Sequence, residues 1–482
     1  MHPLARLDQR FVWHPFTQMR DWLRGEPIVI VAGKGAVLRD VHGREYLDAN
    51  ASIWTNLHGH GHPRINAAIR RQLGKIAHSS ALGLANEPAS QLAARLVALA
   101  NPRWPRAPRL APTLSKVFFS DDGSTALEVA LKLAYEYARR FGLSARPRFL
   151  SLAGAYHGDT VGAVSLGHID LFHRAYAGLL FRSDQVMAPY CYRCPFNRAR
   201  PERADARTYR QCRWECADKV EQRFAARRRR GQPYAGFVFE PLIQGAAGMI
   251  PQPEGWLKRT AEIARGHGAL LIADEVMTGF GRTGAARPEL RNPKSEFLFA
   301  SHHEAVQPDF LCLAKGLTGG YLPMAATLTS QAVFDAFLGE YEEFKTFFHG
   351  HSFTANQLGA AAALASLDLL ESPASRCARQ CLEHTLRDEL SSLWALPPVG
   401  DIRQVGLIVG VELVRDWRTR RPFDLRERAG SRVCEAMARR GVLTRPIGNV
   451  VVLMPPYCTT SAQAQKMVRA LGEAVEETLG KV

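Results

Sequence analysis

The sequence predicts an α/β protein with a large domain on a mostly parallel sheet and a smaller α+β domain. In the middle of the chain, short apolar runs alternate with helical patterns, as in "SKVFFSDDGSTALEVALKLAYEYARR" and "GALLIADEV". Alternation of strand and helix is typical of a parallel sheet that helices cover on both faces. After about Glu371, long Arg-rich helices surround short strands such as "GLIVGVELV". The 482 residues are also more than one small core requires.

Three segments follow from this change of pattern. Residues 1–50 contain short strands and are expected to join the small domain, residues 51–370 to form the large domain, and residues 371–482 to complete the small one. A Cys-rich insert is expected at about residues 188–232. The stretch from Ala286 to Glu296 is expected to be a second insertion.

Composition indicates a soluble globular protein, with 46% hydrophobic and 22% charged residues. No apolar run approaches the roughly 18 residues that a membrane span needs. The N-terminal "MHPLARLDQR" lacks the apolar core of a secretory signal. A cytoplasmic protein without a membrane partner is therefore expected.

A net charge of +16 would also suit a protein that binds nucleic acid. However, 51 of the 62 basic residues are Arg, and they are scattered, with one dense run at Ala225–Arg230. Compositional bias is the simpler interpretation. Nucleic-acid binding is kept as an alternative that a salt-dependent binding assay would test.

Charged residues stand where several predicted strands end. Asp274 ends one apolar run, Glu240 ends another, and Lys315 follows a third and precedes glycines. The carboxyl ends of parallel strands meet at one edge of a sheet, where functional groups gather. A lysine enclosed by apolar strands is costly, and its lowered pKa suits it to form a Schiff base with an aldehyde.

Pyridoxal 5′-phosphate (PLP) is an aldehyde cofactor that fits this pattern. Its cationic ring nitrogen needs a buried carboxylate, which Asp274 offers. Tyr156 and Val276 are candidates for the two faces of the ring. Its phosphate needs backbone N–H groups at a helix start, which Gly123 and Ser124 provide.

Two motifs, "LIADEVMTGFGRTG" and "PDFLCLAKGLTGGYLP", resemble those of the subgroup III aminotransferases, which are fold type I PLP enzymes. The resemblance covers nearly the whole chain. Further stretches are similar to the biotin-pathway branch of this family, namely "FVWHPFTQM", "LHGHGHP", "AYHGDTVGAVSLG", "FHGHSF", "TRPIG" and "VVLMPPY". That branch converts 8-amino-7-oxononanoate to 7,8-diaminononanoate, with S-adenosylmethionine as the amino donor in most members and lysine in some.

The resemblance implies roles for the residues at the cofactor. Lys315 would hold PLP and then move the proton, Asp274 would pair with the ring nitrogen, and Tyr156 would stack on the ring and border the substrate. Glu240 would order the substrate side of the ring, unless it only caps a helix. The cofactor-binding set implied is Gly123, Ser124, Tyr156, Glu240, Asp274, Val276, Lys315, His351 and Ser352.

The resemblance also implies a homodimer, because Ser352 falls where a partner subunit contacts the cofactor phosphate. Arg445 would clamp the carboxylate of the acceptor with two hydrogen bonds. The substrate would lie beside Phe16, Ile53, Trp54, Tyr156, Gly350 and Arg445.

Some positions depart from the biotin-pathway pattern. Phe16 stands where many members have Tyr, Ile53 where many have Trp, and His351–Ser352 where Pro–Thr is usual. Asp122 replaces a Ser in the phosphate loop. The departures at Phe16, Ile53 and His351–Ser352 leave open the choice between S-adenosylmethionine and lysine.

Two alternatives lie within the same family. One is an ω-amino acid:pyruvate aminotransferase, against which the "WHPFTQM" start argues. The other is an aminomutase, which would need no separate amino donor, so an assay for donor dependence would distinguish it.

Four of the nine cysteines are clustered, as Cys191-x2-Cys194 and Cys212-x3-Cys216. This spacing is typical of a structural zinc site and is unlike a secreted disulfide framework. Zinc is therefore a second predicted cofactor, and four free thiols are the alternative.

Overall fold

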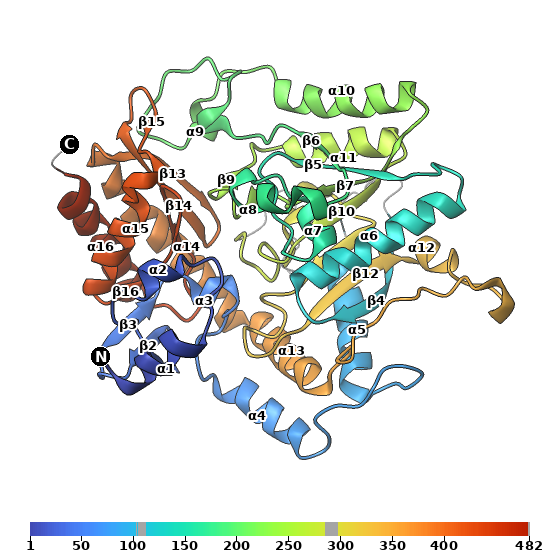
Figure 1. The fold of residues 1–482 in the computed structure, drawn as a ribbon, viewed down its shortest axis with the longest axis horizontal. Coiled ribbons are helices and arrows are strands. Elements are labelled where there is room, and N and C mark those ends of the chain that lie inside the picture. The colour runs from blue at the N-terminus through green and yellow to red at the C-terminus, as the bar shows by residue number, and fades with distance from the viewer. Residues whose placement is uncertain (103, 105–111, 285–296, 481–482) are drawn as a thin grey trace.

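The computed structural model describes residues 1–102, 104, 112–284 and 297–480 (Figure 1). The predicted insertion at 286–296 lies outside the described residues.

A seven-stranded sheet forms the centre of the larger part, in the order β4-β12-β11-β10-β7-β5-β6. Its strands are β4 (Leu114–Ser120), β5 (Arg148–Leu152), β6 (Asp184–Val186), β7 (Tyr234–Phe239), β10 (Leu270–Asp274), β11 (Phe310–Leu313) and β12 (Ala325–Ser330). Neighbouring strands from β11 to β6 are parallel, while β12 runs antiparallel to both β11 and β4. The predicted α/β fold with a mostly parallel sheet is confirmed.

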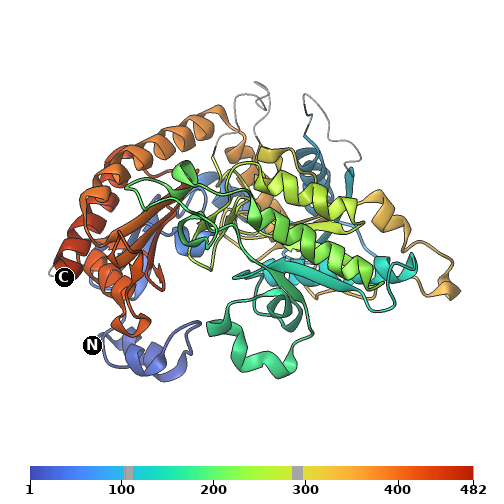
Figure 2. The same cartoon turned by 90° about the horizontal axis from the view of Figure 1, so that it is seen from above.

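Both faces of this sheet are buried. On β10, Leu271 and Ala273 belong to one hydrophobic core, while Ile272 between them belongs to the other. Helices α6 (Gly123–Arg140) and α7 (Val161–Leu166) cover the second face, and α5 (Glu87–Ala100), α10 (Glu215–Arg229) and α11 (Trp256–Gly266) cover the first (Figures 1 and 2). Burial on two faces explains why these strands read as continuous apolar runs.

The smaller part is built on an antiparallel sheet of β13 (Val399–Val405), β14 (Ile408–Asp416), β18 (Val450–Leu453) and β17 (Pro446–Ile447), with β15 (Arg421–Pro422) paired to β14. Its helices are α14 (Pro373–Leu390), α15 (Ala429–Arg439) and α16 (Ser461–Leu479). In a neighbouring sheet, β1 (Ile30–Lys34), β2 (Val37–Asp40) and β3 (Glu45–Asp48) are joined by β16 (Val442–Leu443). The first 50 residues thus lie beside the C-terminal part (Figure 1). The domain boundaries themselves stay a prediction.

The remaining elements connect these sheets or cover them. They are α1 (Pro3–Phe11), α2 (Met19–Trp22), α3 (Ala51–Trp54), α4 (Pro63–Leu73), α8 (Asp170–His173), η1 (Arg174–Leu179), η2 (Cys191–Arg193), α9 (Ala206–Tyr209), β8 (Ile243–Gln244), β9 (Ile250–Pro251), η4 (Ala300–Glu304), α12 (Gln331–Asp335), η5 (Tyr341–Glu343), α13 (Gln357–Leu370), η6 (Ser391–Ala395) and η7 (Leu425–Glu427). None of the helices in the described ranges is long and apolar enough to cross a membrane.

A buried ion network joins the two parts. The Arg403 guanidinium donates to Asp401 (Nη1–Oδ2 2.9 Å) and to Glu412 (Nη1–Oε2 2.6 Å), and its Nη2 donates to the Gly248 carbonyl at 2.7 Å. Arg193, in the Cys-rich insert, donates to the other oxygen of Glu412 through Nε at 2.7 Å. Burial alone would raise the pKa of Glu412. The two guanidinium groups outweigh this effect, so the pKa is lowered. The insert, the small sheet and the β8–β9 turn are therefore joined by one network of ion pairs and hydrogen bonds around Arg403 and Glu412.

We expect Arg403→Ala to lower the free energy of unfolding by about 3–5 kcal/mol, because it leaves the buried Asp401 without an ion-pair partner and leaves Glu412 with Arg193 alone. As a matched control, Arg415→Ala breaks a pair with Glu427 at the surface and should cost less than about 1 kcal/mol. Urea unfolding of the two variants and the wild type measures the difference. Equal losses would show that the network contributes no more than a surface pair.

Candidate active site

A cavity of about 430 Å³ opens at the carboxyl ends of β5, β7 and β10. Eight residues predicted for the site line it: Trp54, Gly123, Ser124, Tyr156, Glu240, Asp274, Val276 and Lys315. Asp122, His157, Gly158, Asp159, Thr160, Ala246 and Met277 complete the lining.

The parallel register of the sheet explains this convergence. Asp274 is the last residue of β10 and pairs with Cys312 of β11, and Lys315 comes two residues after β11 ends. Glu240 directly follows β7, the neighbour of β10 on the other side. Because these strands run in the same direction, the three charged side chains meet at one edge.

The Lys315 amine is enclosed by the ends of the strands and by Trp54. Its Nζ lies 5.2 Å from the centre of the Trp54 ring. Burial lowers the pKa of Lys315, although the charges of Asp274 and Glu240 oppose this shift. A larger share of the amine is therefore neutral, which is the nucleophilic form.

Asp274 is buried and hydrogen-bonded on both oxygens. Its Oδ2 lies 2.7 Å from Nδ1 of His157, and its Oδ1 accepts from the Val276 backbone N–H at 3.1 Å. Burial alone would lower the pKa of His157. The hydrogen bond and the charge of Asp274 outweigh burial, so the pKa of His157 is raised. The imidazole therefore orients the carboxylate from behind.

Glu240 joins two backbone segments and does not cap a helix. Its Oε2 accepts from the Gly245 N–H at 2.7 Å and its Oε1 from the Tyr156 N–H at 3.5 Å. Burial raises the pKa of Glu240 to about 7. The Tyr156 hydroxyl in turn donates to Asp159 at 2.7 Å, which fixes the ring at the mouth of the cavity.

Two glycines shape a cradle at the start of α6. A Cβ on Gly123 would lie 2.7 Å from Val276 Cγ1, and one on Gly158, whose φ is +121°, would lie 2.4 Å from the Ser124 Cβ. Only glycine fits at either position, and the backbone N–H groups of the helix start can approach an anion closely.

Side chains fix the same helix start. Asp122 is the N-cap, and its Oδ1 accepts from the Thr125 N–H at 2.9 Å. The Ser124 hydroxyl lies 2.7 Å from that of Thr160 and accepts from the Thr160 N–H at 2.9 Å. The helix dipole adds partial positive charge at this point.

Trp54 is presented to the cavity by a left-handed turn. The residues of α3, from Ala51 to Trp54, have φ values of 43°, 49°, 62° and 69°. This conformation costs roughly 1–2 kcal/mol per residue without glycine, so other bonds must hold it. Asp48 accepts from the Ser52 N–H at 3.2 Å, and the Trp54 indole donates to Asn50 at 2.8 Å. Ile53, on the same turn, is exposed and does not line the cavity.

These residues fit PLP on each count that the structure can test. The cavity holds an amine, a buried carboxylate and a helix start whose glycines leave room for a phosphate. In addition, Nε2 of the buried His157 has no hydrogen-bond partner among the described residues. When bound, PLP supplies the electron sink for chemistry at an amine-bearing carbon.

Other predicted site residues lie outside this cavity. Phe16 is 58% exposed and stands edge-on to Tyr156, with 6.4 Å between the ring centres. Arg445 is exposed, in the turn before β17. Gly350, His351 and Ser352 lie on the segment before α13, where Nδ1 of His351 is 3.2 Å from Asp121.

The structure does not support the predicted zinc site. Cys191, Cys194, Cys212 and Cys216 are free thiols, and the described residues contain no group of three or more His, Cys, Asp or Glu side chains that could hold a metal ion. Burial raises the pKa of Cys191 and of Cys216 to about 12, which favours the thiol over the thiolate that binds zinc. Hydrogen bonds such as that from Arg193 to Glu412 hold this insert in place.

Comparison with known proteins defines the class. The family described as aminotransferase class-III matches residues 21–475. A PLP-bound amine transaminase from an uncultivated Pseudomonas species superposes with a TM-score of 0.85 at 33% identity, covering 97% of this chain and 99% of that one. The chain belongs to the aminotransferase class-III family and is a PLP-dependent enzyme.

Within this family, several similar relatives carry the same printed name. An adenosylmethionine-8-amino-7-oxononanoate aminotransferase from Geobacter sulfurreducens is 47% identical over 98% of this chain and 97% of its own length. The crystal structure of the enzyme of that name from Methanocaldococcus jannaschii has a TM-score of 0.86 at 38% identity, over 99% of both chains.

Sequence reasoning missed His157, Asp159 and Thr160 as lining residues. All three stand in "AYHGDT", directly after Tyr156, so the motif itself carried the signal. Met277 and Ala246 were also missed, and they lie on turns whose approach to the cavity is set by the fold.

We expect Asp274→Asn to reduce transamination by about 10²-fold or more, because a neutral amide cannot stabilise charge on the cofactor ring. The variant should also lower the pKa of His157 below its ordinary value, because burial is no longer opposed by the carboxylate. Steady-state rates measure the first effect, and NMR titration of the cofactor-free protein measures the second. Near-normal turnover would mean that Asp274 only stabilises the local fold.

Proposed function

We propose that this enzyme transfers an amino group from S-adenosylmethionine to 8-amino-7-oxononanoate and forms 7,8-diaminononanoate, a step of biotin biosynthesis. The observation that carries the proposal is the near full-length identity of 47% to a relative named for this reaction. The cavity adds support, since it joins an enclosed lysine, a buried carboxylate and a phosphate cradle.

Each side chain has a distinct role in this proposal. Lys315 attaches the cofactor and later accepts and returns the proton at the substrate carbon, because its lowered pKa suits it to both tasks. Asp274, oriented by His157, holds the proton on the ring nitrogen. Tyr156 and Val276 confine the ring, and Trp54 excludes water from the amine.

The acceptor carries a carboxylate at the far end of an apolar chain, and Arg445 is proposed to bind it. Arg445 precedes β17, and Ile447 of that strand packs against the same hydrophobic cluster as Trp54. This cluster contains Met277, which lines the cavity with Trp54. The exposed guanidinium is thus tethered to the cavity wall, where a carboxylate can accept two parallel hydrogen bonds.

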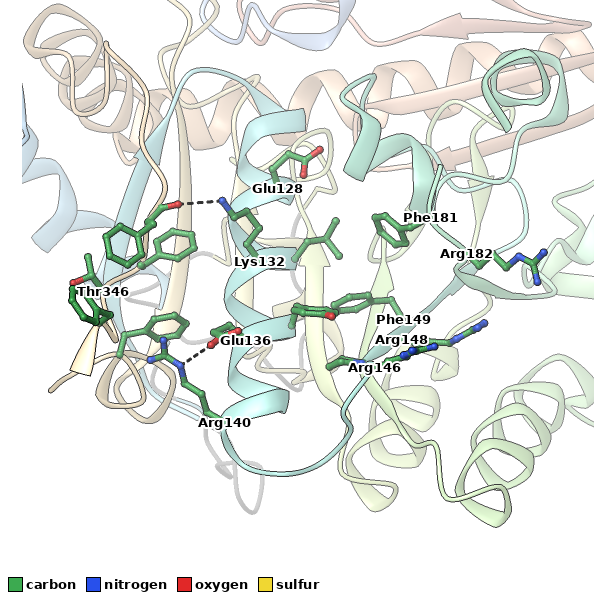
Figure 3. A pocket seen from close by; sticks show the side chains of 17 residues that line it. Glu128, Lys132, Glu136, Arg140, Arg146, Arg148, Phe149, Phe181, Arg182 and Thr346 are labelled. Atoms are coloured by element: carbon green, nitrogen blue, oxygen red, sulfur yellow. Dashed lines mark hydrogen bonds and ion pairs between the residues drawn. The ribbon is translucent and has the colours of Figure 1, made fainter. Parts of the chain in front are cut away.

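A homodimer with shared sites is part of the proposal. Gly350, His351 and Ser352 do not line the cavity of their own chain, and the segment carries exposed aromatic residues, of which Phe348 is 70% and Phe353 60% exposed. A second cavity of about 870 Å³ is lined by α6, by the chain just before this segment up to Phe348, and by residues 146–149 and 181–182 (Figure 3). An apolar surface of this kind is typical of an interface between subunits.

A cytoplasmic location is proposed as well. All nine cysteines of the chain are free thiols. Free thiols without disulfides are typical of proteins that act in a reducing compartment.

The function is tested with purified enzyme, PLP and 8-amino-7-oxononanoate, offered S-adenosylmethionine or lysine in parallel. We expect 7,8-diaminononanoate with S-adenosylmethionine, and no product with Lys315→Ala under either condition. If product formed with lysine and not with S-adenosylmethionine, lysine would be the amino donor. Failure with both donors, combined with activity on a simple amine and pyruvate, would favour an amine transaminase.

We expect Arg445→Ala to raise the KM for 8-amino-7-oxononanoate by about 10²-fold, the loss expected of a charge-assisted pair. The half-reaction with the amino donor should change little. Stopped-flow measurement of both half-reactions checks this. Equal damage to both would show that Arg445 does not serve the acceptor alone.

Mixed dimers test the shared site. Lys315→Ala removes the amine, and Ser352→Asp places a negative charge where the partner's phosphate is proposed to bind. If each site needs Lys315 from one chain and Ser352 from the other, refolding a mixture should restore activity that neither variant has alone. No recovery in the mixture would argue that each chain completes its own site.

A further inference from the structure

A chain of hydrogen bonds leads from the phosphate cradle out of the cofactor cavity. The hydroxyls of Ser124 and Thr160 lie 2.7 Å apart, and both residues line this cavity. The Thr160 hydroxyl also donates to Oε1 of Glu128, which lies one turn further along α6 than Ser124. Glu128 lines the cavity of about 870 Å³ and not the cofactor cavity. Any effect of its carboxylate on the cofactor must therefore pass through other groups.

The protons of this chain follow from the groups that it joins. A carboxylate only accepts hydrogen bonds, so the Thr160 hydroxyl gives its single proton to Glu128. The Ser124 hydroxyl must then donate to Thr160, while Ser124 Oγ accepts from the Thr160 backbone N–H at 2.9 Å. Glu128 thus orients both hydroxyls, and a hydrogen bond to a charged acceptor is stronger than one between neutral groups.

The same carboxylate holds the start of α7. Thr160 is the N-cap of this helix, but its side chain makes no capping hydrogen bond. Glu128 Oε1 instead accepts from the Ala163 backbone N–H at 3.1 Å, which satisfies one donor of the first turn. A Cβ on Gly162 would lie 2.1 Å from Glu128 Oε2. The helix start and the carboxylate are therefore closely fitted to each other.

An ion pair along α6 does not explain the position of Glu128. Lys132 lies four residues further on, which is the spacing of an ion pair on a helix. Its amine instead lies 3.3 Å from the Phe348 carbonyl and 3.1 Å from Nδ1 of His349. Figure 3 shows the side chains of Glu128 and Lys132 extending toward different sides of the helix. The carboxylate is therefore directed at Thr160 and the start of α7.

The segment that ends at Thr160, residues 156–160, carries groups that surround the cofactor ring. Tyr156 is held by Asp159 at the mouth of the cavity, and His157 orients Asp274 from behind. The position of the 156–160 segment relative to the phosphate cradle therefore decides where the ring lies once the phosphate is bound.

We propose that Glu128 is a positioning residue for PLP, which acts through Thr160 to fix the 156–160 segment against the phosphate cradle. The carboxylate touches neither the cofactor nor a substrate. The inference concerns binding of the cofactor alone, so it holds for any amino donor and acceptor. The competing explanation is that Glu128 only caps α7 through the Ala163 N–H.

Binding of PLP to the cofactor-free protein tests the inference. Glu128→Ala should weaken binding about 10-fold, the loss expected of one hydrogen bond to a charged group. Glu128→Gln keeps an accepting oxygen and should stay within about 3-fold of the wild type. Glu136→Ala is the matched control, because Glu136 lies two turns further along α6, bonds to Arg140 and does not line the cofactor cavity. Titration with PLP, followed by the absorbance of the bound cofactor, gives the affinities.

A double-mutant cycle with Thr160→Val separates the two explanations. If Glu128 acts through the Thr160 hydroxyl, Glu128→Ala should change the affinity for PLP little once residue 160 carries no hydroxyl. If Glu128 only caps α7, the losses from the two substitutions add, and the inference is overturned. Thermal unfolding of the cofactor-free proteins is measured in parallel. A lower Tm of Glu128→Ala with unchanged affinity for PLP would likewise overturn it.

Gly162→Ala provides a second variant in which Glu128 itself is retained. Gly162 lies inside α7 without a positive φ, so the backbone tolerates Ala, but the added Cβ displaces the carboxylate. We expect this variant to bind PLP about 10-fold more weakly than the wild type, as Glu128→Ala does. Wild-type affinity in Gly162→Ala would count against the inference even if Glu128→Ala did not fold.

Discussion

The enclosure of opposite charges at one edge of the sheet is the constraint on which the site depends. Lys315, Asp274 and Glu240 could not stay charged at this depth singly, because desolvation of an isolated ion is costly. Together they offset one another, as the opposing effects on the pKa of Lys315 show. The sheet must therefore hold three strand ends at a fixed spacing, so that the two carboxyl groups oppose the effect of burial on the pKa of Lys315.

Most of this edge could be predicted from the sequence, because strand ends are local signals. An apolar run followed by Asp274, or by Lys315 and glycines, predicts both the strand and the charged side chain at its end. The parallel order of the strands then brings these groups together without further information. The same reasoning succeeded for Gly123 and Ser124, where a helix pattern begins directly after a strand.

What could not be predicted depends on the path of loops between distant segments. The four cysteines have the spacing of a zinc site, but spacing says nothing of burial, and the structure shows thiols in an insert that hydrogen bonds such as Arg193–Glu412 hold. Likewise, the contact of Phe16 with Phe172 joins residues far apart in the chain. The motif "AYHGDT" contains His157 but does not indicate its role, because the bond of His157 to Asp274 joins the ends of two different strands.

The left-handed turn of α3 has a consequence for the plasticity of the cavity. Its four residues with positive φ store conformational energy that the bonds of Asp48 and Asn50 hold in place. Glu240, Asp274 and Lys315 themselves have no positive φ, so this strain is concentrated on the Trp54 side of the cavity. Enlargement of the site by substitution would therefore proceed through the Trp54 wall, while the side that holds Lys315 and Asp274 keeps its geometry.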